Sequence, residues 1–566
     1  MTDQRSADLL AMVALLCLAV LVAGVVWASD RGLELTDEAY YLLSAIHPEQ
    51  VTLYISAQHW VLAPLWRLTQ SLQGFRLIGA AILIGSASVL AMGAARAFTQ
   101  VTKGQAARLL DLGMTMAAGC IGALLYVATI APSPSYNLLA SAGAYGAFGF
   151  ALLALDRRLG PSLGLGGLGG VALAVCFVCK PSAGVCVGLT VLLVVLGLQS
   201  GPRKWAICGM GLLGTLGTVA LMVAVQPREP SVIDSLRGGL DLFRMVQTEP
   251  MTDRLIRYAV TLATFFAKSL VAFWPVIGLV ILSWRYPRRW LFGLTLLVWP
   301  LNLYVERNYL SGMTALVRMA EAIYVLVFVI VALWLNGAAV PGKAKLLLGA
   351  LFCLPFAATI GTGNELFTQV VVALAPWTVG VAVLARACDP RLPTFLLQRG
   401  ATGLLLILLT VQITVSYLRD PYHLAEPLIR QTETVRVPQL GMVKVDPQTR
   451  QFLDQIAQAR QTCAIVPGGA YFGMFNLPGL ALTLDLVPPV TPWLNNAEQT
   501  VTVLQRWSPG AFDRIVVALS ADARAKPLLL PPDLRPDAKG YAFCGRATVP
   551  QDGQVIDIWA SPIFAG

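Results

Sequence analysis

Charged residues are scarce in this chain of 566 residues: Asp, Glu, Lys and Arg make up 13% of it, whereas hydrophobic residues make up 56%. Soluble domains carry about 25% charged residues, so the composition argues against a soluble protein. The mean hydropathy of +0.68 agrees, and long apolar runs recur from residue 9 to residue 418. The sequence therefore predicts a polytopic α-helical membrane protein. The net charge of +10 is explained by basic residues in alternate loops between the membrane spans. No nucleic-acid partner is therefore expected.

The apolar runs predict thirteen membrane spans. The first covers residues 9–29; a cleaved signal peptide is the alternative, but residues 1–8 hold only Arg5 as a cation. The first outer loop, 30–73, is expected to hold short interfacial helices at 40–45 and 60–72. The remaining spans are predicted at 74–95, 108–131, 138–155, 165–179, 183–199, 205–225, 258–283, 290–304, 320–336, 345–361, 368–386 and 401–418.

Cations concentrate in every second loop, which predicts the orientation. These loops lie at 96–108, 157–158, 203–204, 285–289, 343–345 and 386–399. Because positively charged loops stay in the cytoplasm, the N-terminus is expected on the cytoplasmic side. The membrane is expected to be a bacterial inner (plasma) membrane. The first outer loop, the loop 227–257 and everything after residue 418 are then periplasmic or extracellular.

Residues 419–566 differ from the rest, because their apolar runs are short and turn signals appear among them. Helical spacing covers 448–461 and 495–507, and strands are predicted at 463–466, 514–519 and 553–560. The division is thus 1–418 for the transmembrane domain and 419–566 for an extracytoplasmic α/β domain. Only Cys463 and Cys544 lie in this second part, and an oxidising compartment predicts a disulfide between them. Cys176 and Cys179 form a CxxC inside a span, where packing is the expected role.

Two adjacent carboxylates, Asp37 and Glu38, follow the first span, with Tyr40 and Tyr41 behind them. Neighbouring residues of a helix point about 100° apart, so the two acids are not expected to act as one dyad. We hypothesise that Asp37 is a catalytic base and that Glu38 supports it; Glu38 as the base is the alternative. A purely structural interpretation is that Thr36 or Asp37 caps a helix that begins at Ala39.

The arrangement of one span, an outer loop with Asp-Glu and aromatic residues, and a His-containing segment about Gln58-His59-Trp60 resembles the GT-C superfamily of integral-membrane glycosyltransferases. The likeness is to the branch of the aminoarabinose transferases and the protein O-mannosyltransferases. The resemblance implies a GT-C-like fold, a polyprenyl-phosphate sugar donor, and an envelope glycan, lipid or protein acceptor. It also implies that Asp37 is the acidic residue of the first outer loop.

Lys180 stands between two short spans, in Lys180-Pro181-Ser182. A lysine between apolar helices is costly and marks a site by default, and its ammonium is suited to bind a phosphate. The structural alternative is a snorkelling side chain. Four arginines at outer span ends are weaker candidates for the phosphate, since such residues are more often interfacial anchors: Arg254, Arg257, Arg307 and Arg318. The candidates for substrate contact are Tyr40, Tyr41, His59, Tyr136, Asn137 and Lys268, the last of these expected near the bilayer middle.

The second outer loop, 132–137, contains no acid, and Asn137 stands where many relatives have one. Hard cations are held by several carboxylates, so we expect no cofactor and a metal-independent, inverting transfer. An oligosaccharyltransferase or glycan ligase is one alternative. A lipid-sugar transporter is another, although transporters show internal repeats and midplane acids, which this sequence lacks.

Overall fold

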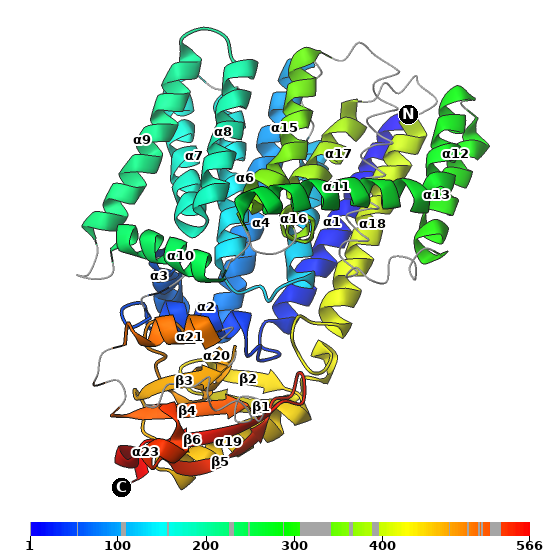
Figure 1. Ribbon diagram of the computed structural model, residues 1–566. Helices are drawn as coiled ribbons and strands as arrows, with labels where there is room; N and C mark the ends of the chain where they lie inside the picture. Colours follow the sequence, from blue (N-terminus) through cyan, green and yellow to red (C-terminus); the bar gives the residue numbers. More distant parts are fainter. Residues whose placement is uncertain are drawn as a thin grey trace.

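The computed structural model describes residues 2–51, 53, 55–102, 109–155, 158–225, 231–246, 250–286, 288–305, 341–361, 366–387, 395–474, 476–494, 497–507, 510, 513–520 and 534–565. Most of them form a bundle of long helices, and all the strands lie beyond its last helix (Figure 1). The fold class that the sequence predicts, a polytopic helical protein with a C-terminal α/β region, is confirmed.

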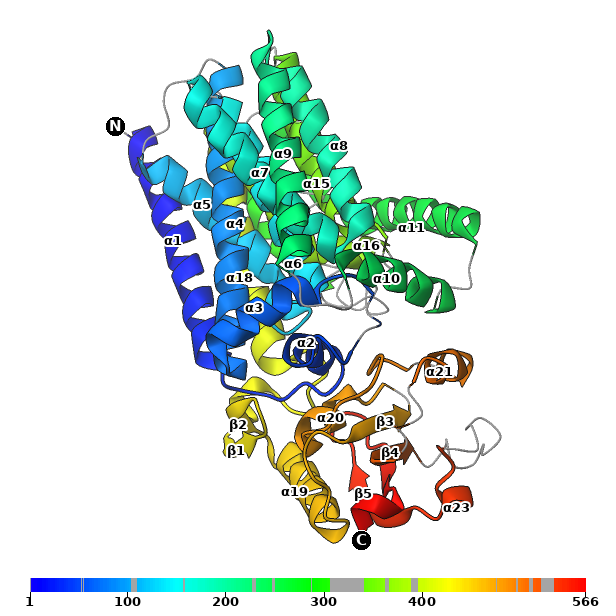
Figure 2. The ribbon, with the colours of Figure 1, turned by 90° about the vertical axis from the view of Figure 1, so that its left-hand side faces the viewer.

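The long helices of the bundle run side by side (Figures 1 and 2). Nine helices in the described residues are long and apolar enough to cross a membrane. Where α4 crosses α6, a Cβ on Gly93 would lie 2.4 Å from the Gly149 carbonyl oxygen, so small residues set how closely these helices pack. The bundle comprises α1 (Thr2–Ala28), α4 (Leu72–Val101), α5 (Leu109–Leu124) with η1 (Leu125–Ala128), α6 (Tyr136–Leu155), α7 (Leu159–Cys179), α8 (Pro181–Leu198), α9 (Arg203–Ala224), α12 (Trp274–Arg285), α13 (Arg289–Val305), α15 (Gly342–Thr359), α16 (Leu366–Val370), η2 (Val371–Ala373), α17 (Ala375–Ala387) and α18 (Phe395–Arg419).

The predicted span 258–283 is wrong. Two helices replace it: α11 (Met251–Ala272) lies across the bundle, and α12 runs along it (Figure 1). Pro275, in the first turn of α12, has no backbone N–H to continue a preceding helix. The charged residues of α11, Lys268 among them, suit an amphipathic helix rather than a spanning one. The predicted span 320–336 lies outside the described residues.

Three shorter helices separate the bundle from the C-terminal region (Figure 2). Two come from the first outer loop, α2 (Asp37–Ile46) and α3 (His59–Thr69), where interfacial helices are expected. The third, α10 (Val232–Val246), closely approaches that loop: a Cβ on Gly239 would lie 2.5 Å from the Ile55 carbonyl oxygen. These helices form the layer on which the site is built.

The C-terminal region has a four-stranded sheet in the order β3-β4-β6-β5, in which β3 and β4 are parallel and the other pairs antiparallel. A separate hairpin, β1 with β2, precedes it. The elements are η3 (Leu428–Arg430), β1 (Glu433–Val437), β2 (Gly441–Val445), α19 (Pro447–Thr462), β3 (Ala470–Met474), α20 (Pro478–Leu484), α21 (Ala497–Leu504), β4 (Ile515–Ser520), α23 (Pro536–Lys539), β5 (Ala542–Thr548), β6 (Val555–Ala560) and α24 (Pro562–Ala565).

The predicted disulfide between Cys463 and Cys544 is present, with a Cα–Cα distance of 5.3 Å. The predicted strand at 463–466 is wrong, because Cys463 ends α19 and the chain then turns. The disulfide therefore fastens α19, not a first strand, to β5. Cys176 and Cys179 are buried free thiols, as packing residues would be.

The first outer loop is the surface on which the C-terminal region rests. Backbone hydrogen bonds join Gly32 to Lys444, Gly479 to Leu35, and Leu53 to Val490. Side chains add the ion pair of Lys444 with Asp30, at 2.7 Å. The chain before α2 is thus held from both sides, by the bundle and by the C-terminal region.

Candidate functional site

Asp37 begins α2, where a negative charge favourably meets the helix N-terminus. Its side chain is not the helix cap, and Thr36 makes no side-chain capping bond either. Glu34 caps the helix instead, because its carboxylate accepts hydrogen bonds from the backbone N–H groups of Thr36 and Glu38. Asp37 is therefore free to point elsewhere, and its Oδ2 accepts a hydrogen bond of 2.6 Å from the hydroxyl of Tyr422.

Glu38 points the other way, into a closed ion pair with Arg76 of α4. The side chains of both are buried, at 1% and 4% exposed. Arg76 donates to both oxygens of Glu38 and to backbone carbonyls of the chain that precedes α2. The hydroxyl of Ser133 donates to Glu38 as well. Both carboxylate oxygens are thus engaged, so the geometry separates the two adjacent acids.

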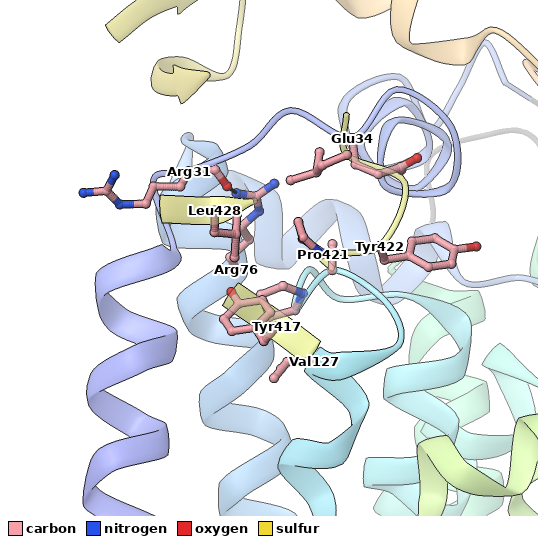
Figure 3. Close-up of a pocket in the computed structure, with 11 residues that line it drawn as sticks. Arg31, Glu34, Arg76, Val127, Tyr417, Pro421, Tyr422 and Leu428 are labelled. Carbon is pink, nitrogen blue, oxygen red and sulfur yellow. Dashed lines mark hydrogen bonds between the residues drawn. The ribbon is translucent and has the colours of Figure 1, made fainter. Parts of the chain in front are cut away.

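A small cavity of ≈ 20 Å³ lies beside these acids. In Figure 3, Glu34 and Tyr422 lie toward one side of it, and Arg31 and Arg76 toward the other. This volume holds about one water molecule, so the cavity is too small for a sugar. Burial, followed by the neighbouring Asp37 charge, raises the pKa of Glu34 above its ordinary value.

Aromatic rings form the wall next to Asp37. The rings of Tyr40 and Tyr41 lie 5.6 Å apart, and Tyr41 lies 6.0 Å from Tyr136 of α6. Trp493 of the C-terminal region closes the other end, 5.5 Å from Tyr40. Burial, with a further contribution from the Asp37 charge, raises the pKa of Tyr41 well above its ordinary value, so this side chain stays a neutral hydroxyl.

Lys180 reaches the same wall from the junction of α7 and α8. Its side chain is buried, and its Nζ lies 6.0 Å from the centre of the Tyr136 ring and 3.4 Å from the Asn137 Oδ1. No carboxylate among the described residues pairs with it. Burial lowers the pKa of Lys180 to about 7, because a buried ammonium without a counter-charge is costly.

The other predicted site residues lie in different surroundings. His59 is buried on α3, with its Nε2 3.3 Å from the Ser235 hydroxyl of α10, and burial lowers its pKa to about 3. Arg254 is buried, with its guanidinium 4.9 Å from the Phe243 ring, and Arg257 lies 5.7 Å from the Tyr258 ring. Lys268 lies on α11, which crosses the bundle and is not among the helices apolar enough to span a membrane, so its expected place in the middle of a span is wrong. Arg307 and Arg318 lie outside the described residues.

Four residues of this site escaped the sequence analysis: Glu34, Arg76, Tyr422 and His423. Arg76 had a signal, because a cation inside a predicted span needs a partner. Glu34 had a weaker one, its place three residues before Asp37. Tyr422 and His423 had none, since they lie 385 residues or more from the groups that they contact.

No family model matches the chain, and no curated protein matches it. Among solved structures, it is similar to the crystal structure of ArnT from Cupriavidus metallidurans bound to undecaprenyl phosphate, with 15% identity, 98% of each chain covered and a TM-score of 0.47. The apo crystal structure of ArnT is similar with 13% identity, the same coverage and a TM-score of 0.44. Likeness of this degree carries neither substrate nor activity over to this chain.

Proposed function

We propose that this protein is an inverting, metal-independent glycosyltransferase. In this proposal it moves a sugar from a polyprenyl-phosphate donor to a glycan, lipid or protein acceptor of the cell envelope, at the outer face of the inner membrane. The observation that carries the proposal is the asymmetric state of Asp37. Its Oδ2 is held by Tyr422, whereas its Oδ1 accepts no hydrogen bond from any described residue. A carboxylate held in this way is suited to take a proton.

Lys180 supports the same assignment from the other end of the tyrosine wall. A buried cation with one long hydrogen bond is poised to bind an anion, and a phosphate would supply the missing counter-charge. Tyr136 lies between the two ends, since its ring centre is 6.0 Å from that of Tyr41 and 6.0 Å from the Lys180 Nζ. The proposal therefore places the phosphate at Lys180, the sugar along the tyrosines and the acceptor at Asp37.

The chemistry needs one base and one anion site. Asp37 removes the proton of the acceptor hydroxyl as its oxygen attacks the anomeric carbon from the face opposite the phosphate. The new C–O bond forms while the bond to the phosphate oxygen breaks, and the polyprenyl phosphate leaves with that electron pair. The configuration at the anomeric carbon is inverted. Positioned general-base catalysis contributes about 10²–10⁴-fold.

The donor set supports a reaction without a metal ion. Of the acids in this loop, Glu38 is engaged by Arg76 and Ser133, and Glu34 by two backbone N–H groups. Asn137, the second-loop position, accepts from Lys180. Hard cations need several carboxylate or carbonyl oxygens at once. If added chelator abolishes transfer and manganese restores it, the metal-free assignment is wrong.

The test uses full-length protein in lipid nanodiscs with a panel of radiolabelled undecaprenyl-phosphate sugars and an envelope extract as acceptor. Asp37→Asn is expected to lower turnover about 10²–10⁴-fold while undecaprenyl phosphate still binds. The matched control is Glu49→Gln, which removes an exposed carboxylate from the same loop. Unchanged activity in Asp37→Asn would contradict the proposal, as would transport of the sugar lipid without transfer.

A further inference from the structure

The short segment that follows the last helix of the bundle reaches back to the first outer loop. α18 ends at Arg419, and His423 has a backbone φ of 50°, in the left-handed region. Few residues other than glycine adopt this conformation, and it is found where the surroundings impose it. Here it lets two consecutive side chains face the same loop. The ring of Tyr422 stacks on that of His423, with the centres 3.8 Å apart and the planes 16° apart.

The two stacked rings contact different acids. Tyr422 donates its hydroxyl to Asp37, at 2.6 Å. His423 places its Nδ1 2.9 Å from the Thr36 hydroxyl and 3.6 Å from Glu34. Thr36 in turn donates to Glu34. Tyr422 and His423, two consecutive residues that follow the last helix of the bundle, therefore contact both Asp37 and Glu34.

Charge explains why the two contacts belong together. Glu34 is buried, and the nearby charge of Asp37 adds to the effect of burial in raising the pKa of Glu34. His423 is half exposed. The neighbouring Glu34 carboxylate raises the pKa of His423, against the opposing effect of burial. A protonated His423 offsets Glu34 and leaves Asp37 as the uncompensated base. The other ionisable groups lining the small cavity are Arg31, Arg76 and Tyr417.

We propose that Tyr422 and His423 are positioning residues for the catalytic base: Tyr422 fixes one oxygen of Asp37 and so turns the other toward the acceptor, and His423 neutralises the neighbouring Glu34. This inference rests on the proposed function, because Asp37 must be the base for its orientation to matter. It makes the C-terminal segment part of the active site, so the bundle up to residue 419 is incomplete without it.

The kinetic test is Tyr422→Phe in full-length protein, with the undecaprenyl-phosphate sugar that the donor panel identifies. This change keeps the stacked ring and removes only the hydroxyl. Hydrogen bonds to charged groups are worth enough to predict a roughly 10- to 100-fold lower kcat, with KM for the donor nearly unchanged.

Tyr471→Phe is the matched control. Tyr471 is a buried tyrosine of the C-terminal sheet whose hydroxyl donates to the Leu477 carbonyl, at 2.8 Å. Its loss removes a tyrosine hydrogen bond away from the site, so stability falls while kcat stays. If Tyr422→Phe behaves like Tyr471→Phe, the hydroxyl has a merely structural role and the inference is wrong.

A second measurement reads the geometry without turnover. The chain has three histidines, so imidazole NMR of histidine-labelled protein resolves His423 once His47→Asn and His59→Asn assign the other two. His423 is expected to titrate above the ordinary value, and Glu34→Gln is expected to bring it down. Tyr422→Leu should shift its ring resonances, whereas Tyr422→Phe should not.

The two measurements separate the possible failures. If wild-type protein transfers no sugar, the proposed function fails, and the positioning role fails with it even if NMR shows the stacked pair. If wild-type protein is active and Asp37→Asn is inactive, but Tyr422→Phe keeps full kcat, only the positioning role fails. A His423 titration that ignores Glu34→Gln would overturn the charge-neutralising part alone.

Discussion

Arg76 and Lys180 are both buried cations on the side of the bundle that faces the C-terminal region, yet their surroundings differ in kind. Arg76 fills its donors with the two oxygens of Glu38 and with backbone carbonyls. Lys180 has one hydrogen bond of 3.4 Å and a ring 6.0 Å away. The planar guanidinium of arginine has donors in fixed directions and suits a structural site with several permanent partners. The ammonium of lysine is a point charge whose partners can change.

The difference teaches how to separate structural from functional charge in this layer. The Arg76–Glu38 ion pair has its donors and acceptors engaged within the protein, so it is not available to bind a substrate. It holds the chain before α2 in place. A desolvated cation without a counter-charge is unfavourable in the free protein, and a bound anion relieves that cost. Four predictions test this contrast, beginning with the largest expected effect.

Arg76→Met should destabilise the protein strongly. Removing one partner of a buried pair leaves Glu38 uncompensated, which costs about 3–5 kcal/mol. The thermal unfolding midpoint in detergent is expected to fall accordingly. The double variant Arg76→Met with Glu38→Leu should recover much of the loss, because no buried charge is then left alone. A double variant as unstable as the single one would show that Arg76 acts through its backbone contacts and not through the ion pair.

Lys180→Met should have the opposite profile. The folded protein loses an unfavourable buried charge, so the unfolding midpoint without lipid is expected to stay or rise. Binding of undecaprenyl phosphate, followed by native mass spectrometry, should weaken roughly 10- to 100-fold, the worth of a charged hydrogen bond. The control is Lys345→Met, which removes an exposed lysine of α15. Equal affinity in Lys180→Met and wild-type protein would place the phosphate elsewhere.

The smallest effect is the pH dependence of lipid binding. Lys180 has a pKa lowered by burial to about 7, so the free protein loses this charge as the pH rises through that value. Affinity for undecaprenyl phosphate is expected to fall roughly tenfold between about pH 6 and pH 8, relative to Lys180→Arg, which keeps its charge. The Arg variant also corrects for ionisation of the lipid itself.

The lowered pKa of Lys180 also predicts how the stability of the lipid-free protein changes with pH, in the direction opposite to the change in lipid affinity. Above about pH 7, the unfolded chain binds a proton at Lys180 that the folded chain does not, so the lipid-free protein gains stability as the pH rises toward the ordinary lysine range. Affinity and stability should therefore change in opposite directions. If Lys180→Met removes neither trend, another group causes them.

Local patterns determined much of this protein. The scarcity of charge and the apolar runs predict the bundle, helical spacing predicts α19, and the only two cysteines after residue 418 predict the disulfide. Asp37, Tyr136, Asn137 and Lys180 also came from the sequence. Each of these is readable because its signal is a residue that is costly or unusual in its immediate surroundings.

Tertiary structure alone decided how these residues are paired. Asp37 and Glu38 are neighbours in the chain, and only packing shows that one meets Tyr422 and the other Arg76. The turn of α11 across the bundle and the return of residues 420–424 to the first loop depend in the same way on contacts between distant segments. Hydropathy and spacing report what each segment buries, not which segment it is buried against, so the partners of Asp37 became visible only in the folded chain.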